Sequence, residues 1–177
     1  MLCPASFAEL EKMLDMAINE MDGPVAIRYP RGGEGAYKDV SHGITEVLTH
    51  GGDITLAAYG TMVNTMLELS QKLAADGISA EVIKISQIKP MRTDEIVESL
   101  RKTRKLLTAE DVCEHGCVGE MLLIAAEKAG VCLDGASICT LGGGIVTHGT
   151  VAELYKDCGL DSDTLYKKAI TLVRGAK

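Results

Sequence analysis

The chain carries the run ITLAAYGT at residues 54–61, and this run decides the fold. Ile54–Tyr59 reads as a strand of the fully buried type, and Gly60 and Thr61 then turn the chain. Apolar side chains follow at helical spacing, and Gly77 is the expected end of that helix. A second buried strand is predicted over Ile78–Ile85. A strand, a helix and another strand in this order predict parallel strands of one sheet.

The same alternation continues from this unit to the C-terminus. A third strand is predicted over Lys105–Thr108, and a fourth over Ala136–Cys139. The clearest amphipathic helix lies between them at residues 118–129. Two more helices are expected to begin at Thr150, which has a capping-box spacing to a glutamate, and at Asp161. We therefore expect a three-layer α/β fold, with a mostly parallel sheet and helices on both faces.

The region before this unit has a different organisation. A capping box at Ser6 predicts a helix whose apolar face includes Phe7, Leu10, Leu14, Ala17 and Met21, and a short strand is expected over Val25–Tyr29. One helix and one strand have no partner layer, so they must pack on something else. We expect residues 1–35 to be the end of another α/β domain, residues 36–52 to be a linker with a small strand, and residues 53–177 to be a second domain.

Composition excludes several classes of protein. The chain has 177 residues, of which 46% are hydrophobic and 24% charged, so it is long enough for an ordinary globular core. A net charge of −7 and an aromatic content of 3% argue against a nucleic-acid partner. No apolar run is long enough to span a bilayer and no signal peptide is recognised, so we expect a soluble, cytoplasmic protein with reduced cysteines.

A possible metal site is the segment that contains Cys113, His115 and Cys117. A structural zinc site usually joins two ligand pairs, and this sequence lacks the second pair, so the segment is interpreted as a turn without metal. The glycine run at residues 142–144 does not have the spacing or position of a dinucleotide fingerprint and is also interpreted as a turn. His148 precedes a helix start, where a capped turn is favoured over an anion site.

Charged residues at two strand ends are the remaining candidates. Glu110 and Asp111 follow a predicted strand, at the edge where open α/β sheets place ligands, although two solvated acids would give the same pattern. Arg31 follows another predicted strand, between a proline and two glycines. Its guanidinium suits a bidentate contact with phosphate, but a structural salt bridge explains an arginine there equally well.

Seven pieces of the chain together resemble the 1-deoxy-D-xylulose-5-phosphate synthases of the transketolase-like superfamily. They are GPVAIRYPRG at residues 23–32, DITLAAYG at 53–60, GISAEV at 77–82, IKP at 88–90, TAED at 108–111, VTHG at 146–149 and GLD at 159–161. Their order and spacing cover essentially the whole chain. The chain departs from the family pattern at Asp111, where a second glutamate is common, and at residues 113–117, which replace part of a glycine-rich turn.

The resemblance implies a C-terminal portion of a homodimeric enzyme that condenses pyruvate with glyceraldehyde 3-phosphate and releases CO₂. It implies that thiamine diphosphate and Mg²⁺ are bound by parts that this chain lacks, so the chain alone is expected to bind neither and to be inactive. Arg31 matches a position that contacts the sugar phosphate in this superfamily, and Arg28 is a second candidate. The alternatives are a split transketolase-like subunit and a stand-alone α/β module for dimerisation or ligand binding.

Overall fold

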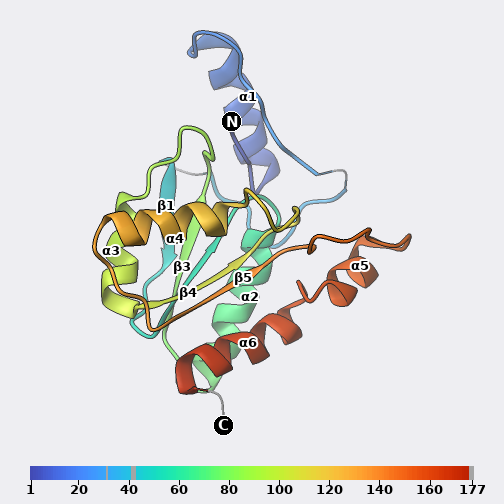
Figure 1. Cartoon of the computed structure of the whole chain (residues 1–177). Coiled ribbons are helices and arrows are strands. Elements are labelled where there is room, and N and C mark those ends of the chain that lie inside the picture. Colours follow the sequence, from blue (N-terminus) through green and yellow to red (C-terminus); the bar gives the residue numbers. More distant parts are fainter. Residues whose placement is uncertain (31, 41–42, 176–177) are drawn as a thin grey trace.

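A five-stranded sheet forms the centre of the computed structural model, which describes residues 1–30, 32–40 and 43–175 (Figure 1). The strand order is β1-β3-β2-β4-β5. The sheet is mostly parallel, as the sequence predicts, and only β1 runs antiparallel to its neighbour β3. The strands are β1 (Thr45–Thr49), β2 (Ile54–Ala58), β3 (Ala80–Ile85), β4 (Lys105–Ala109) and β5 (Gly135–Cys139).

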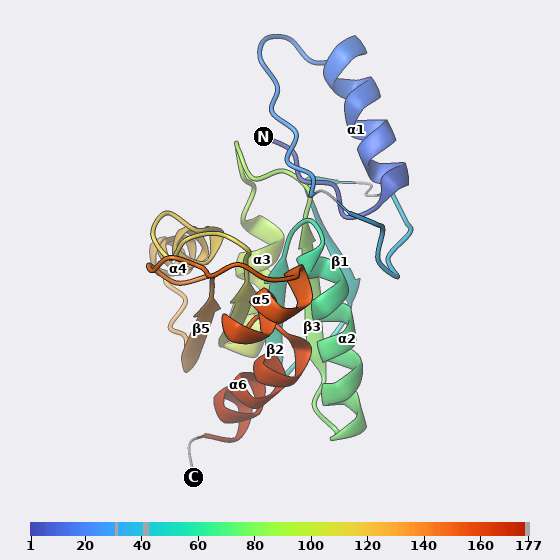
Figure 2. The same ribbon diagram turned by 90° about the vertical axis from the view of Figure 1, so that its right-hand side faces the viewer.

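Two pairs of helices cover the two faces of this sheet (Figures 1 and 2). On one face, α2 (Met62–Ala75) packs against α6 (Ser162–Arg174) around side chains such as Leu69 and Leu165. On the other face, α3 (Asp94–Thr103) packs against α4 (Val118–Lys128) around Ile96 and Leu122. Because each face has its own apolar core, the predicted three-layer α/β architecture is confirmed.

The order of the strands creates a switch point between β2 and β4. From β2 the chain passes through α2 to β3 on one side, and then through α3 to β4 on the other side of β2. The connections therefore diverge at the carboxyl ends of β2 and β4, which leaves a crevice there. In open α/β sheets this crevice is where ligands bind.

The N-terminal helix α1 (Phe7–Asn19) projects beyond the end of the sheet at which α2 begins (Figures 1 and 2). Its N-cap is Ser6, as predicted, and the Ser6 hydroxyl accepts a hydrogen bond from the Glu9 amide. The predicted reciprocal contact is wrong, because the Glu9 carboxylate accepts hydrogen bonds from the Ala5 amide and from the buried Lys84 ammonium instead. A buried ion pair of 2.6 Å thus joins the first turn of α1 to β3.

Two other expectations for the N-terminal region need correction. The run Val25–Tyr29 does not form a strand, because its pairing is limited to an isolated bridge between Ile27 and Leu2. The predicted apolar face of α1 is largely exposed, with Phe7 57% accessible, while Glu9 and Met13 are the buried side chains of this helix. Helical spacing identifies an apolar face, but it does not specify that the same chain covers it.

The short strand predicted in residues 36–52 is β1, which extends the sheet beyond β3. Residues 41 and 42 of this segment lie outside the described residues. The capping box at Thr150 is confirmed at the start of α5 (Val151–Asp157), where the Thr150 hydroxyl and the Glu153 carboxylate bond to each other's backbone amides. No helix in the described part of the chain is long and apolar enough to cross a membrane.

Candidate functional site

A cavity of about 550 Å³ opens at the switch point, next to the carboxyl ends of β2 and β4. Polar groups come from Thr61 at the start of α2, Asp111 after β4, and Tyr155 on α5. The other described residues that line it are glycine and apolar: Pro30, Gly32, Gly33, Leu141, Val146, Val151 and Leu154. The cavity thus brings together segments that are more than 100 residues apart in the sequence.

Arg28 is held beside this cavity by an ion pair with Asp111. One terminal nitrogen of its guanidinium lies 2.8 Å from Asp111 Oδ1 and 3.4 Å from the Asp111 carbonyl oxygen. The guanidinium also lies 5.6 Å from the centre of the Tyr59 ring, within the range of a cation–π contact. Partial burial disfavours the charged guanidinium, but the adjacent Asp111 carboxylate outweighs this and raises the pKa of Arg28.

The second oxygen of Asp111 faces α5. The Tyr155 hydroxyl donates a hydrogen bond to Asp111 Oδ2 over 3.3 Å. Burial is the main cause that raises the pKa of Tyr155, and the negative charge of Asp111 adds to it, so this hydroxyl stays protonated and remains a donor. Asp111 therefore joins Arg28 on one side to α5 on the other.

Glu110 has a different role, although it precedes Asp111 in the chain. Its carboxylate is buried and accepts hydrogen bonds of 2.7 Å from the backbone amides of Val118 and Gly119. These two amides belong to the first turn of α4, where amides have no partner within the helix. The Tyr59 hydroxyl donates a third hydrogen bond to Glu110. Glu110 is therefore a helix-capping residue, and neither of its oxygens is free for a ligand.

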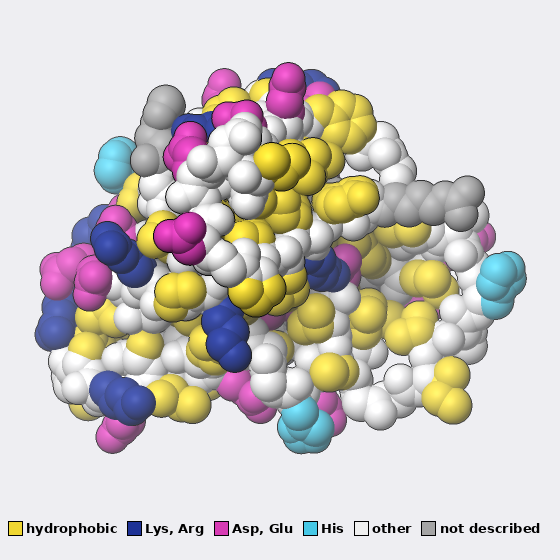
Figure 3. Space-filling model, turned by 90° about the horizontal axis from the view of Figure 1, so that it is seen from above, with side chains coloured by type: hydrophobic (Ala, Val, Ile, Leu, Met, Phe, Trp, Pro, Cys, Tyr) yellow, Lys and Arg dark blue, Asp and Glu magenta, His cyan; other side chains and the backbone are white. Residues whose placement is uncertain are grey.

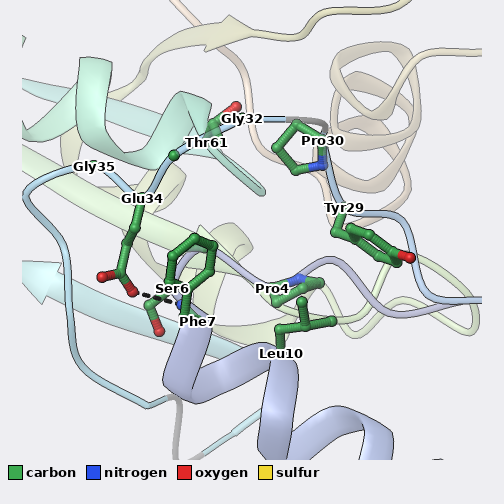
Figure 4. A pocket seen from close by; sticks show the side chains of 12 residues that line it. Pro4, Ser6, Phe7, Leu10, Tyr29, Pro30, Gly32, Glu34, Gly35 and Thr61 are labelled. Atoms are coloured by element: carbon green, nitrogen blue, oxygen red, sulfur yellow. Dashed lines mark hydrogen bonds between the residues drawn. The ribbon is translucent and has the colours of Figure 1, made fainter.

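A second, smaller cavity of about 40 Å³ lies next to the first, between α1 and the segment that follows Arg28 (Figure 4). Phe7 and Leu10 of α1 face Tyr29 and Pro30 across it. The Phe7 amide donates a 2.5 Å hydrogen bond to Glu34, which ties the start of α1 to that segment. Among the described residues, the two cavities share Pro30, Gly32, Gly33 and Thr61 in their linings.

Hydrophobic side chains also gather on the end of the molecule that carries α1 (Figure 3). Four of them belong to α1 or to the residues just after it: Phe7, Leu14, Ile18 and Met21, of which Ile18 is 77% exposed. Exposed apolar side chains that lie this close together are typical of a surface that contacts another segment or another protein.

The structure separates the candidates that the sequence suggested. Arg31 lies outside the described residues, and Arg28 and Asp111 meet directly. His115 is exposed, and the Cys113 thiol contacts the His115 carbonyl oxygen over 3.5 Å, while Cys117 is buried at the start of α4. The described residues include no group of three or more histidine, cysteine, aspartate or glutamate side chains that could hold a metal ion.

Sequence reasoning missed both tyrosines of the site. Tyr59 had a recognisable signal, since it directly follows the central strand β2 on the same edge as Glu110. Tyr155 had none, because it lies in the middle of a short helix and reaches Asp111 only because its side chain packs against the apolar core.

Comparisons with known proteins agree on one superfamily. The family model "Transketolase, C-terminal domain" matches residues 43–165. A 1-deoxy-D-xylulose-5-phosphate synthase of Microcystis aeruginosa is 32% identical over 176 residues, which is 96% of this chain and 28% of that protein. The synthase of Acaryochloris marina is 37% identical over 132 residues, covering 71% of this chain and 21% of its own length. The chain thus spans about a quarter of the length of these relatives.

Two solved structures show the same fold. The first is a "Split gene transketolase, inactive beta4 tetramer", with a TM-score of 0.76 and 27% sequence identity. The aligned region is 98% of this chain and 58% of the chain in that structure. The second is a mutant transketolase of Pichia stipitis, with a TM-score of 0.53 and 15% identity, covering 74% of this chain and 18% of its own. This second likeness concerns the fold alone.

Proposed function

Because the chain belongs to the transketolase C-terminal domain family, we propose that it forms the C-terminal part of a thiamine-diphosphate-dependent 1-deoxy-D-xylulose-5-phosphate synthase. This enzyme condenses pyruvate with glyceraldehyde 3-phosphate and releases CO₂. The observation that carries the proposal is the 32% identity to a relative of that name over 96% of the chain. On this proposal, residues 1–35 end the pyrimidine-binding domain, residues 36–52 link the domains, and residues 53–177 are the C-terminal domain.

We assign thiamine diphosphate and Mg²⁺ to regions of the enzyme outside this chain. The described residues do not fit the metal–diphosphate group, since no acidic, histidine or cysteine cluster among them is suited to an ion. When bound, the cofactor would supply the carbanion chemistry that pyruvate decarboxylation needs. The contribution of this chain is then limited to binding and orienting the second substrate.

Arg31 is the residue that we propose to bind the phosphate of glyceraldehyde 3-phosphate. The support is its match to the phosphate-contacting position of the superfamily and the planar fork of its side chain, which suits a bidentate contact with an anion. Arg28 is the second candidate for this role. Its contact with Asp111 favours a supporting position, because that contact already uses one of its terminal nitrogens.

A second candidate function is a subunit of a split transketolase-like enzyme. The observation that favours it is the solved split-gene transketolase, which covers almost the whole chain at a TM-score of 0.76. In both functions we propose a cytoplasmic enzyme that contains more than one copy of this chain, and for the synthase a homodimer of the complete enzyme. The tetrameric state of that structural neighbour and the exposed apolar side chains of α1 support such an assembly.

The test is the reaction of the complete enzyme that contains this chain. With pyruvate, glyceraldehyde 3-phosphate, thiamine diphosphate and Mg²⁺, we expect it to form 1-deoxy-D-xylulose 5-phosphate and CO₂ in equal amounts. Transfer of a ketol group from a sugar phosphate, without CO₂ release, would instead identify the split transketolase-like subunit.

The isolated chain is the matched control. In calorimetric titration it should not bind thiamine diphosphate with Mg²⁺. One-to-one binding with a Kd near 1 μM, about −8 kcal/mol, would overturn the proposed division of labour between this chain and the rest of the enzyme.

A further inference from the structure

The ligand-binding edge of the sheet is occupied by a side chain of the same protein. Open α/β sheets bind ligands outside the carboxyl ends of their strands, at the switch point. Here the Arg28 guanidinium lies at that point, over the Tyr59 ring that follows β2 and against the Asp111 carboxylate that follows β4. From this geometry we propose that Asp111 is a positioning residue: it holds Arg28 and thereby sets the position of Tyr29 and Pro30, which line the smaller cavity. The functional consequence rests on the function proposed above.

The Arg28 side chain is anchored more firmly than an ordinary surface arginine. Its ion pair with Asp111 has side-chain exposures of 30% and 19%. The Arg104–Asp134 pair of the same chain has the same nitrogen–oxygen distance of 2.8 Å, but both of its side chains are 51% exposed. Solvent screens a contact at the surface more strongly, so the Arg28–Asp111 pair is the stronger restraint.

The backbone around Arg28 is restrained as well. The Arg28 amide donates to the Leu2 carbonyl oxygen, and the Leu2 amide donates to the Ala26 carbonyl oxygen, both over 2.8 Å. Pro30 follows two residues later, and its ring fixes its own φ angle. Tyr29 and Pro30 therefore follow directly on a restrained residue, and both line the smaller cavity.

Asp111 has the contacts that such a role requires. One carboxylate oxygen accepts a hydrogen bond from Arg28, and the other accepts one from the Tyr155 hydroxyl. The carboxylate is therefore itself held from two sides. Since Asp111 follows β4, its contact with Arg28 links the edge of the C-terminal domain to the segment that begins at Arg28. This gives the C-terminal domain a specific task in the proposed reaction, namely to set the position of that segment.

The first test measures hydrogen exchange of the isolated chain by mass spectrometry. Asp111→Asn should make the hydrogen-bonded amides of Leu2 and Arg28 exchange roughly tenfold faster, because local opening of the chain around Arg28 becomes easier. Asp134→Asn, which breaks the equally short surface pair, should leave them unchanged. Arg28→Lys keeps the charge but lacks the planar fork, so it should also accelerate exchange and gives a second variant if Asp111→Asn folds poorly. Equal exchange in all these variants and the wild type would overturn the proposal.

The second test uses the complete enzyme and two acceptors, glyceraldehyde 3-phosphate and unphosphorylated glyceraldehyde. Asp111→Asn should raise KM for the phosphorylated acceptor several-fold, and should leave kcat and the use of the unphosphorylated acceptor nearly unchanged. An equal loss for both acceptors would show that Asp111 is merely structural. If the wild-type enzyme does not carry out the proposed reaction at all, the proposed function fails, whereas the exchange experiment still decides whether Asp111 holds the segment.

Discussion

At the residue scale, Glu110 caps the start of α4, a role that the N-cap residue of this helix does not fill. The N-cap residue Cys117 makes no side-chain hydrogen bond to the helix, and Glu110 supplies two from the end of β4. Glu110→Ala should lower the free energy of unfolding by about 1.5–3 kcal/mol, because it leaves two buried amides and the Tyr59 hydroxyl without their acceptor. Chemical denaturation measures this change.

Glu120→Ala is the control for that variant, since Glu120 accepts one hydrogen bond from the Gly116 amide at an exposed site. It should cost well under half as much as Glu110→Ala, because water replaces an exposed acceptor at small cost. Equal losses in the two variants would refute the capping role of Glu110.

The thiol of Cys3 makes stability depend on alkaline pH. Burial raises its pKa from 9.0 to about 11, and the nearby Arg28 charge only partly opposes this. Between these values the unfolded chain releases a proton that the folded chain keeps, so stability should fall as the pH rises from 9 to 11, by about 2–3 kcal/mol. Denaturation of wild type and Cys3→Ala across this range should give a steeper fall for the wild type. The same pH dependence of stability in both proteins would contradict the raised pKa of Cys3.

Only part of the site was predictable at this scale. The position of Glu110 and Asp111 after a buried strand placed them at the ligand edge of the sheet. The sequence left a structural salt bridge open for Arg31, which lies outside the described residues, and did not predict the salt bridge that Arg28 forms. Its partner could not be identified in advance, because Asp111 lies 83 residues away and no local pattern links the two.

At the scale of elements, two adjacent glycines at the turn between β1 and β2 differ sharply. A Cβ atom on Gly51 would lie 2.2 Å from the Ala80 carbonyl carbon, whereas one on Gly52 would meet nothing within 4 Å. Gly51→Ala should therefore destabilise the protein by about 1–3 kcal/mol, because it pushes the turn between β1 and β2 away from the start of β3. Gly52→Ala should change stability by less than about 0.5 kcal/mol. Thermal or chemical unfolding of both variants decides; similar values would contradict the close approach at Gly51.

Helices and strands with a regular spacing of apolar residues were predictable from the sequence. Features that depend on contacts with another segment were not. The four parallel strands and the helices between them follow directly from apolar spacing and capping residues. The run Val25–Tyr29 has the composition of a strand but meets only an isolated bridge to Leu2. For α1 the spacing gave the apolar face correctly, but the side chains on it are largely exposed because the described residues do not pack over them.

At the scale of the whole molecule, the fold and the family agree, and the proposed function involves more than this chain. The mostly parallel sheet and the match to the transketolase C-terminal domain support each other. The curated relatives are about four times as long as the region they share with this chain, as the 28% coverage of the Microcystis aeruginosa synthase shows. What this chain adds to the proposed reaction is therefore best tested through the second substrate.

The most direct measurement is kcat/KM of the complete enzyme and of its Arg31→Ala variant, with phosphorylated and unphosphorylated glyceraldehyde. Loss of a bidentate charged contact should cost about 1.5–3 kcal/mol, or roughly 10- to 150-fold, with the phosphorylated acceptor alone. Arg31→Lys should recover part of this loss. Decarboxylation of pyruvate should change little, because this step comes before the reaction with the phosphorylated acceptor. An equal fall of kcat/KM for both acceptors would contradict the proposal that this chain recognises the substrate phosphate.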